Sequence, residues 1–242
     1  MPRPARTASV ADQHAAPGGA AAVDRALSLL AAFRCGDSAL TLAELAARTD
    51  LYKSTALRLL ASLEHARLVQ RLEDGRYALG SEVARLHAIY AVSFSLDRVV
   101  LPVLRQLVAR TGESAAYHVR QGDARVCLYR VDSPHPVREH IVVGERLPLE
   151  RGSGGRVLSA FDAELAKRGT ARERRLYAEI RSRGYHAAVG DRLAEVAGIS
   201  APVFHADDSL AASLTLTMPS HRYDERYAKA VLEAARQLSG QV

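Results

Sequence analysis

Four residues with cationic or hydroxyl side chains fall within six positions of the chain. They are Lys53, Ser54, Thr55 and Arg58. Side chains of this kind bind phosphate oxygens, and an arginine can also contact guanine through two hydrogen bonds. The spacing of Leu57, Leu60 and Leu63 predicts a helix over residues 52–65 whose leucines face inward. Because the four polar residues then lie on the outward side, we expect them to contact DNA, with Arg58 as the first candidate for a base contact.

Two further arginines flank a predicted turn. Asp74–Gly75 separates two short extended runs, and Asp-Gly in that position predicts a β-hairpin with a two-residue turn. Arg71 and Arg76 then lie near the hairpin tip, where they can reach a minor groove or phosphate groups. Arg25, on an earlier predicted helix, is expected to meet the DNA backbone.

The elements around these residues follow the order of a winged helix-turn-helix. A first helix is predicted from an apolar stripe made by Val23, Ala26, Leu27, Leu30 and Phe33. Thr41 and Glu44 form a capping box that starts a short second helix, which residues 49–51 connect to the helix at 52–65. Three helices and a hairpin predict a winged helix-turn-helix over residues 21–80. A helical bundle with an ordinary solvated face, used for protein interaction, is the alternative.

The composition of the 242-residue chain is that of a globular protein, with 48% hydrophobic and 25% charged residues. The net charge of +6 is spread along the chain, so it does not locate a nucleic-acid partner. No apolar run approaches the length of a membrane span, and we expect neither a signal sequence nor contact with a membrane. Two distant cysteines, Cys35 and Cys127, predict neither a disulfide framework nor a zinc site and fit a reducing cytoplasm. Residues 1–20 are expected to form a disordered tail.

The chain divides near residues 80–97. Residues 81–96 predict one more helix, which is either a stiff connector or a dimer-forming helix. Residues 97–242 alternate strands and helices, with antiparallel hairpins. We therefore expect an α+β protein with two domains: a winged helix-turn-helix, a linker helix, and a C-terminal α+β sensor-like domain.

A second group of residues with chemical potential is the Gly-Ser-Gly-Gly sequence at residues 152–155, directly before a predicted helix. Successive amides at a helix N-terminus form an anion-binding concavity, and glycine lets a ligand approach closely. Small carboxylates suit such a site. The alternative is a simple turn that caps the helix.

Enzyme motifs are not found in this chain. A hydrolase elbow needs glycine two residues before its serine, whereas Arg151 stands two residues before Ser153. The glycine turn matches neither a P-loop nor a dinucleotide-binding fingerprint. The nine histidines lack the spacing of zinc ligands. We therefore predict a protein that is not an enzyme, with no catalytic residue, no metal and no cofactor.

The quoted motifs together resemble a known family. The segments AVDRALSLLAAF, LTLAELAARTDLYKSTALRLLASLEHARLV and GRYALG resemble the DNA-binding half of the isocitrate lyase regulator (IclR) family of bacterial transcription factors. GERLPLERGSGGRVLSAF, RSRGYHAAVGDRLAEVAGISAPVF and SLAASLTLTMPSHRY resemble its effector-binding half, so the resemblance covers about residues 20–240. The chain departs from the family at residues 65–67, where a glycine is usual, and at Tyr52, which is often proline. Neither departure removes a predicted DNA contact.

The resemblance implies a C-terminal effector-binding domain similar to the GAF and profilin folds. It also implies an effector pocket walled by the glycine turn, by residues 189–198 and by the closing strand. The candidate effector-binding residues are Arg151, Ser153, Gly154, Gly155, Val189, Asp191, Val196, Gly198, Thr215 and Thr217. Thr215 and Thr217 alternate along one strand, so both hydroxyls lie on one face. The chain departs from the family at Glu150–Arg151 and at Glu195, near the expected pocket. Arg151 can pair with a carboxylate through two hydrogen bonds, or with Glu150 or Glu145 as a surface ion pair.

The predicted function is a ligand-responsive, DNA-binding transcriptional regulator of catabolic genes in the cytoplasm. Its expected partners are palindromic double-stranded operator DNA and a small organic acid, with aromatic acids among the candidates. One recognition helix per chain predicts a homodimer. The resemblance implies homodimers or dimers of dimers and the control of catabolic genes. The alternative is a small-molecule-binding or enzymatic module whose N-terminal helices serve oligomerisation.

Overall fold

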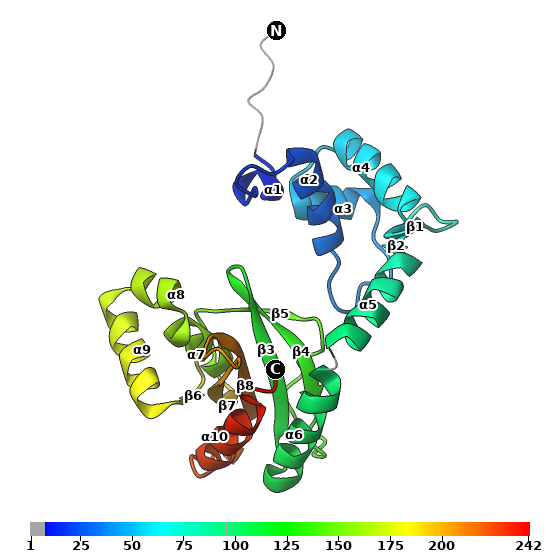
Figure 1. Cartoon of the computed structure of the whole chain (residues 1–242). Coiled ribbons are helices and arrows are strands. Elements are labelled where there is room, and N and C mark those ends of the chain that lie inside the picture. Colours follow the sequence, from blue (N-terminus) through cyan, green and yellow to red (C-terminus); the bar gives the residue numbers. More distant parts are fainter. Residues whose placement is uncertain (1–7, 95) are drawn as a thin grey trace. The chain divides into compact units, whose positions relative to one another are not determined.

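The structure is a computed structural model that describes residues 8–94 and 96–242, with the side chains of residues 91–94 left aside. The chain divides into two compact units, Met1–Phe94 and Ser95–Val242 (Figure 1). Within the described residues, no helix combines the length and the apolar character needed to cross a membrane.

The N-terminal unit holds five helices and a two-stranded hairpin. They are α1 (Val10–Gln13), α2 (Ala21–Ala31), α3 (Leu42–Thr49), α4 (Lys53–His65), β1 (Val69–Arg71), β2 (Tyr77–Leu79) and α5 (Ser81–Phe94). Its core is built from Leu29 of α2, Leu45 of α3 and Leu60 of α4, all fully buried. Tyr77 of the hairpin exchanges two backbone hydrogen bonds with Leu40, of 2.8 and 2.7 Å, which fixes the hairpin beside α3.

The predicted capping box of α3 is present. The Thr41 hydroxyl accepts a hydrogen bond from the Glu44 amide at 3.2 Å, and the Glu44 carboxylate accepts one from the Thr41 amide at 2.8 Å. Two of the three leucines predicted to face inward from α4, Leu60 and Leu63, are buried, but Leu57 is 46% exposed and Ala56 is buried instead. The spacing of residues 56, 60 and 63 follows one face of a helix, and Leu57 lies to the side of that face.

The apolar stripe predicted for the first helix is also corrected in part. Val23 and Leu27 are exposed, whereas Leu29 is the buried residue of α2, with Ala26 and Leu30 packed partly against the core. The buried face is therefore centred on Leu29, two positions after Leu27.

The hairpin turn differs from the two-residue turn that Asp-Gly predicts. The Leu72 amide donates to the Arg76 carbonyl at 2.8 Å, so three residues, 73–75, form the loop. The Gly75 amide donates to the Leu72 carbonyl at 2.9 Å, and Gly75 has φ of +80°. Such a loop needs a left-handed conformation only at its last position, which the glycine supplies.

Part of the expected disordered tail over residues 1–20 is ordered instead, because Val10–Gln13 form helix α1. Ser9 and Asp12 form a capping box at its start. The Asp12 carboxylate pairs with Arg25 of α2 at 2.6 Å, which holds α1 on α2. Residues 1–7 lie outside the described residues.

The C-terminal unit is built on a six-stranded antiparallel sheet in the order β5-β4-β3-β8-β7-β6. The strands are β3 (Ser114–Gln121), β4 (Ala124–Val131), β5 (Arg146–Pro148), β6 (His186–Val189), β7 (Val196–Phe204) and β8 (Leu210–Pro219). Helices α6 (Leu96–Thr111) and α10 (Tyr227–Leu238) pack on the sheet around the large apolar core.

Three more helices complete this unit. They are α7 (Ser153–Phe161), α8 (Ala163–Arg168) and α9 (Ala171–Arg183), and a short 3₁₀ turn, η1, spans Ser220–Arg222. Helix α7 packs on β7 and β8, and α8 and α9 pack on α7 (Figure 1). Residues of β7 and β8 alternate between the α6–α10 core and the α7 side: Ile199 and Leu216 belong to the core, whereas Ser200 and Thr215 bond with Ser153 of α7 or with each other. The unit is thus an α+β domain whose α7 side is polar.

Candidate functional site

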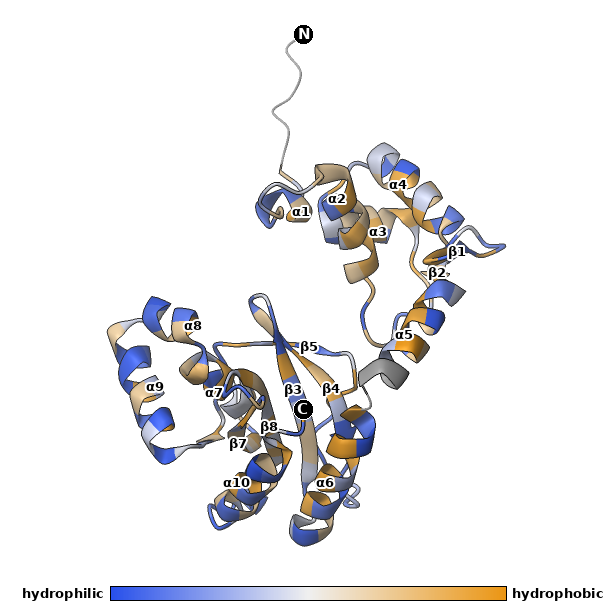
Figure 2. Cartoon of the chain, viewed as in Figure 1, coloured by the Kyte–Doolittle hydropathy of each residue, from blue (hydrophilic) through white to orange (hydrophobic). Residues whose placement is uncertain are grey.

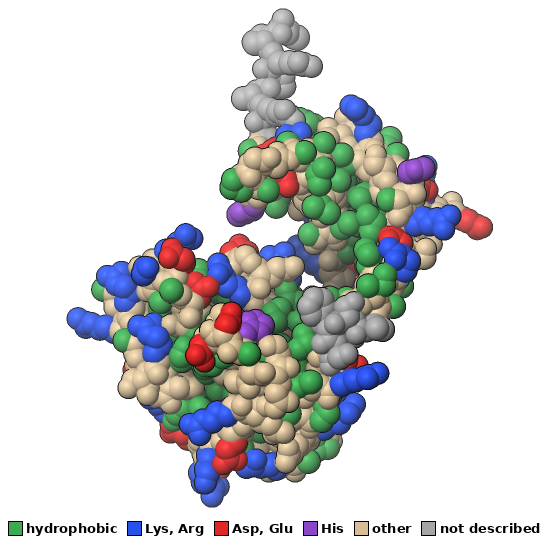
Figure 3. Space-filling model, in the orientation of Figure 1, with side chains coloured by type: hydrophobic (Ala, Val, Ile, Leu, Met, Phe, Trp, Pro, Cys, Tyr) green, Lys and Arg blue, Asp and Glu red, His purple; other side chains and the backbone are tan. Residues whose placement is uncertain are grey.

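The outward face of α4 carries the predicted cationic residues. Lys53, Ser54 and Arg58 are exposed and Thr55 is half-buried. Among the described residues, neither Lys53 nor Arg58 takes part in an ion pair, so their charges are available to a partner. Figure 3 shows basic side chains over α4 and near the hairpin. The first turn of α4, with Lys53, and the second turn, with Arg58, can therefore contact a polyanion at the same time.

The hairpin arginines differ in their surroundings. Arg76 pairs with Asp74 at 2.7 Å, and hydrogen bonds from the Arg76 backbone and side chain lower the pKa of Asp74. Arg71 is exposed, and its guanidinium lies 6.0 Å from the centre of the Tyr77 ring. Arg71 is therefore the hairpin cation with the charge more available to DNA.

Arg25 is placed differently from the other predicted DNA contacts. Its side chain is only 18% exposed and is paired with Asp12. Hydrogen bonds from Ser9 and Arg25 lower the pKa of Asp12 to about 2, so this carboxylate stays charged and keeps Arg25 engaged. The structure therefore gives Arg25 an internal partner, and a DNA contact from it would require that pair to open.

Arg67 stands where the family usually has a glycine, and its backbone explains that preference. Arg67 has φ of +57°, in the left-handed region. It directly follows α4, where the Leu68 amide donates to the Leu63 carbonyl at 2.9 Å. Glycine adopts this conformation without the steric cost that a side chain brings.

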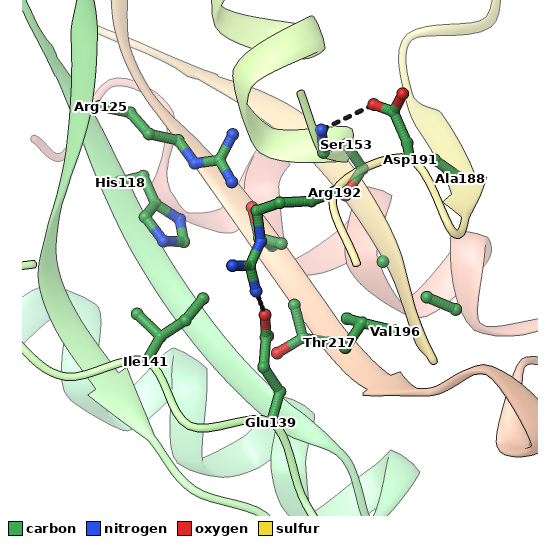
Figure 4. Close-up of a pocket in the computed structure, with 14 residues that line it drawn as sticks. His118, Arg125, Glu139, Ile141, Ser153, Ala188, Asp191, Arg192, Val196 and Thr217 are labelled. Carbon is green, nitrogen blue, oxygen red and sulfur yellow. Dashed lines mark hydrogen bonds and ion pairs between the residues drawn. The ribbon is translucent and has the colours of Figure 1, made fainter. Parts of the chain in front are cut away.

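A pocket lies on the α7 side of the C-terminal sheet and encloses about 360 Å³ of empty space, part of it open to solvent (Figure 4). The predicted residues that line it are Ser153, Asp191, Val196, Gly198, Thr215 and Thr217. Arg151, Gly154, Gly155 and Val189 are not among its lining residues. The predicted turn, loop and closing strand thus come together, with four of the ten residues elsewhere.

The two glycines inside α7 have a packing role. A Cβ at Gly154 would lie 2.7 Å from Oγ1 of Thr215, and one at Gly155 would lie 2.3 Å from the carbonyl of Leu149. Both approaches are shorter than packed atoms allow, so any side chain there would push α7 away from the sheet. Glycine is therefore required at both positions by the packing of α7 against Thr215 and the Leu149 carbonyl.

Two arginines line the pocket, Arg125 and Arg192, whereas Arg151, the arginine that the sequence pointed to, is not among the lining residues. Arg151 and Val189 are exposed. Arg125, on β4, is 3% exposed and donates through Nη1 to the carbonyls of Pro148 and Arg151, at 3.1 and 2.8 Å. Burial lowers the pKa of Arg125 to about 10, so the guanidinium keeps its charge at neutral pH. Sequence reasoning gave Arg125 no role, because nothing within its own strand marks it as a pocket residue.

Two acidic side chains in the pocket already have partners. The Asp191 carboxylate accepts a hydrogen bond from the Gly152 amide at 2.6 Å, at the start of α7, and lies 3.4 Å from Arg156. Glu139 forms an ion pair with Arg192, which reaches across the pocket (Figure 4). One backbone amide at the N-terminus of α7 is therefore already hydrogen-bonded to a carboxylate of the protein itself.

His118 of β3 was also missed by sequence reasoning. It is 1% exposed, and neither Nδ1 nor Nε2 has a hydrogen-bond partner among the described residues. Burial, together with Arg125, Arg130 and Arg192 nearby, holds the pKa of His118 well below its usual value, so the ring is neutral. The signal was the alternation within SAAYHVRQ, but the face that this residue occupies depends on a bulge between Tyr117 and His118.

A chain of hydroxyls joins α7 to the sheet. Ser200 Oγ lies 2.8 Å from Ser153 Oγ and 2.9 Å from Thr215 Oγ1. Thr217 Oγ1, one strand alternation further on, has no partner among the described residues. Thr215 and Thr217 do face the same side, as predicted, and Thr217 is the one whose hydroxyl is not yet used.

The remaining chemistry is that of binding. Cys127 is buried, and burial raises the pKa of its thiol to about 11, so it carries no reactive thiolate at neutral pH. Within residues 8–94 and 96–242, no three His, Cys, Asp or Glu side chains gather closely enough to hold a metal ion. A buried guanidinium, a neutral imidazole and hydroxyls suit an oxygen-rich anion.

Comparison with known proteins gives a consistent result for both units. A model of the IclR helix-turn-helix domain matches residues 22–73, and a model of the C-terminal domain of the bacterial transcriptional regulator IclR matches residues 88–171 and 173–242. The HTH-type transcriptional regulator BhcR of Paracoccus denitrificans is 30% identical over 245 residues, covering 92% of this chain and 87% of the relative.

Solved structures share the fold of the chain. An IclR homologue from Microbacterium hydrocarbonoxydans, crystallised with 4-hydroxybenzoate, superposes with a TM-score of 0.76 at 25% identity, covering 90% of this chain and 97% of the homologue. An IclR transcriptional regulator from Alicyclobacillus acidocaldarius superposes with a TM-score of 0.78 at 24% identity, covering 91% and 98% of the two chains. The winged helix-turn-helix and the α+β domain are therefore both those of known regulators.

Proposed function

Because the chain belongs to the IclR family of bacterial transcriptional regulators, we propose that it binds operator DNA and that a small organic acid in the C-terminal pocket changes this binding. The observation that carries the proposal is the exposed face of α4, where Lys53 and Arg58 are charged and lack an internal partner among the described residues. This face can enter the major groove while the hairpin reaches the flanking backbone.

The proposed effector is a carboxylic acid. Arg125 supplies a buried positive charge beside the start of α7, and such a guanidinium binds a carboxylate more strongly than exposed arginines do. The homologue crystallised with 4-hydroxybenzoate contains an organic acid, which supports a ligand of this class. An acid produced or consumed in catabolism would link the regulator to catabolic genes, and no catalytic role is proposed for the chain.

The proposed assembly is a homodimer, or a dimer of dimers, on a palindromic operator in the cytoplasm. Leu86, Ile89 and Tyr90 of α5 are all exposed, and their spacing puts them on one helix face. Figure 2 shows apolar colouring on part of α5. An exposed apolar face of this kind suits contact with a second copy. Two copies bring two α4 helices to two half-sites, which one module rarely binds tightly enough alone.

The effector is proposed to act by differential binding. A ligand shifts an equilibrium only by the difference between its affinities for the DNA-bound and the unbound conformations. The expected linker helix, which the structure describes as α5 over Ser81–Phe94, is the proposed route by which the pocket influences the DNA-binding unit. Operator affinity should then change on adding the acid at fixed salt.

The experiment is a fluorescence-anisotropy titration of the full chain with duplex DNA from upstream of its own gene and with an unrelated duplex of equal length. The proposal expects tighter binding to the upstream duplex. Failure to bind either duplex at low ionic strength would favour the alternative, in which the N-terminal helices serve only oligomerisation. Mass measurement in solution tests the dimer, and a monomer bound to one half-site would contradict it.

A further inference from the structure

Several polar atoms are buried around the pocket without a hydrogen-bond partner. Among the described residues these include Nε of Arg125, both ring nitrogens of His118, and Oγ1 of Thr217. Buried polar groups are almost always hydrogen-bonded, because leaving one unpaired costs free energy. Figure 4 shows Arg125 and His118 reaching into the pocket from one side and Thr217 lying on the other. The vacant hydrogen bonds therefore surround one space.

Arg125 is the pocket cation that forms no ion pair among the described residues. Arg192 is paired with Glu139, and Arg156 pairs with both Asp191 and Glu173. Arg125 donates through Nη1 to two backbone carbonyls, and the charge of Asp191 acts on it without a hydrogen bond among the described residues. A buried guanidinium without an ion pair is costly, and a directly bonded carboxylate would offset that cost. One carboxylate group of a ligand therefore fits beside Arg125.

The apolar part of the lining is small. Ile141, Val196 and Ala188 contribute aliphatic surface, and no Phe, Tyr or Trp is found among the described residues that line the pocket. Aromatic ligands gain much of their affinity from stacking against rings. The lining thus offers several hydrogen bonds and little surface for an aromatic ring.

We propose that the pocket selects a non-aromatic monocarboxylic acid that carries two or more hydroxyl or oxo groups. The carboxylate binds Arg125 beside the start of α7, and the other oxygens bond with His118 and Thr217. This inference rests on the proposed function only in calling the ligand an effector, since the site itself is argued from the pocket.

The protonation state of His118 agrees with a hydroxylated ligand. A neutral imidazole has one donor nitrogen and one acceptor nitrogen, and a hydroxyl group can accept from the first or donate to the second. The lowered pKa of His118 keeps the ring in that form. A ligand with a single polar end would leave at least one of these nitrogens, or Thr217 Oγ1, unpaired.

The test measures binding of chosen acids to the full-length protein by calorimetry and by the rise in melting temperature. The hydroxylated probes are D-glycerate and D-gluconate. Propanoate and hexanoate have the same chain lengths without the hydroxyls, and 4-hydroxybenzoate is the aromatic probe. A ligand that binds only the folded protein raises its melting temperature. We expect at least one hydroxylated acid to bind roughly tenfold or more tightly than its unhydroxylated match and than 4-hydroxybenzoate.

Two variants tie this binding to the named atoms. Thr217→Val removes a hydroxyl without a partner, so the ligand-free protein should melt at the same temperature or higher while the acid binds about tenfold more weakly. A merely structural threonine would instead lower the melting temperature. Arg125→Lys keeps the charge and loses the planar fork, so affinity for the carboxylate should also fall. Thr111→Val is the matched control, because Thr111 Oγ1 donates to the Leu107 carbonyl at 2.8 Å on α6, and its effect on acid affinity should be nil.

The inference is overturned if neither hydroxylated acid raises the melting temperature, if the unhydroxylated or aromatic acids bind equally well, or if Thr217→Val leaves affinity unchanged. Operator binding is measured on the same preparation. Acid binding without operator binding contradicts the proposed function alone. Operator binding that responds to 4-hydroxybenzoate and to no hydroxylated acid overturns this inference alone.

Discussion

The two units keep their unpaired polar groups in opposite places. In the N-terminal unit the buried Thr49 hydroxyl is satisfied by the Leu45 carbonyl at 2.7 Å, and the available cations Lys53 and Arg58 are on the surface. In the C-terminal unit the unpaired polar atoms are buried. Among the described residues, every buried side-chain nitrogen or oxygen without a hydrogen bond belongs to a residue within the sequence range 118–217, which is part of this unit.

This difference matches two kinds of partner. A surface with free cations suits a large polyanion that cannot enter the protein, such as DNA. A buried space with vacant hydrogen bonds suits a small ligand that can be enclosed. The predictions below substitute residues in one unit and measure both operator binding and acid binding.

The largest effect is expected from a core substitution in the N-terminal unit. Leu60→Ala should destabilise this unit by about 2–5 kcal/mol, because Leu60 is fully buried between helices. Operator affinity should fall, while acid affinity stays that of the unchanged protein. Urea unfolding and calorimetry measure the two effects.

The reciprocal variant is Leu104→Ala in α6, which is also fully buried. It should lower the affinity for the acid more than the affinity for the operator. If both variants reduced acid affinity equally, the two units would not be as separate as their cores indicate.

A smaller effect is expected at the DNA-binding surface. Arg58→Ala should weaken operator binding by about 1–3 kcal/mol, because it removes an exposed guanidinium without an internal partner among the described residues. Arg76→Ala should cost less, since Arg76 is engaged by Asp74. Anisotropy with operator and unrelated duplexes distinguishes a base contact, lost mainly on the operator, from a phosphate contact, lost on both. An effect of Arg76→Ala larger than that of Arg58→Ala would reverse the assignment.

The stability of the C-terminal unit should depend on pH because of the buried His118. The pKa of His118 is lowered in the folded protein, so below the unfolded value of about 6.5 the unfolded chain binds a proton that the folded chain does not. Stability should therefore fall as pH falls below about 6.5, by at most about 1.4 kcal/mol per pH unit for one group, with no contribution at higher pH.

His118→Leu should flatten this dependence without removing it, because the pKa of His186 is also lowered by burial. Urea midpoints for the C-terminal transition at pH 7.5 and 5.5 give the measurement. Identical pH slopes for the two proteins would show that His118 takes up its proton equally in both states.

The smallest effect is expected at the joint between α4 and the hairpin. Arg67→Gly should stabilise the N-terminal unit by about 1 kcal/mol, because it relieves a left-handed conformation at φ of +57°. Thermal unfolding measures this gain. Arg67→Ala serves as the control, since it removes the same charge and keeps the strain, and equal melting temperatures for the two variants would rule out the backbone explanation.

The sequence predicted the N-terminal unit well because its signals are local. The Thr41–Glu44 box and the Asp74–Gly75 turn each involve residues within a few positions of one another. The errors were of detail: Leu57 is exposed, and its neighbour Ala56 takes the buried position instead.

The pocket was harder to predict because it depends on pairing between distant segments. Thr215 and Thr217 were found from alternation along one strand, which is again local. His118 and Arg125 come from β3 and β4, and His118 pairs with Ser213 across almost a hundred residues of chain. Glu139 lies in a segment without regular structure. Neither a strand's partner nor its bulge can be read from the strand itself.

The most direct test of the central claim is the salt dependence of operator affinity for the unchanged chain and for Lys53→Ala and Arg58→Ala. If the exposed face of α4 contacts DNA, affinity falls steeply with salt, and each variant that removes a phosphate contact lowers the slope of log affinity against log salt by about 1. If the chain binds no duplex at low salt, or if both variants bind with the slope and affinity of the unchanged chain, α4 is not the DNA-binding surface.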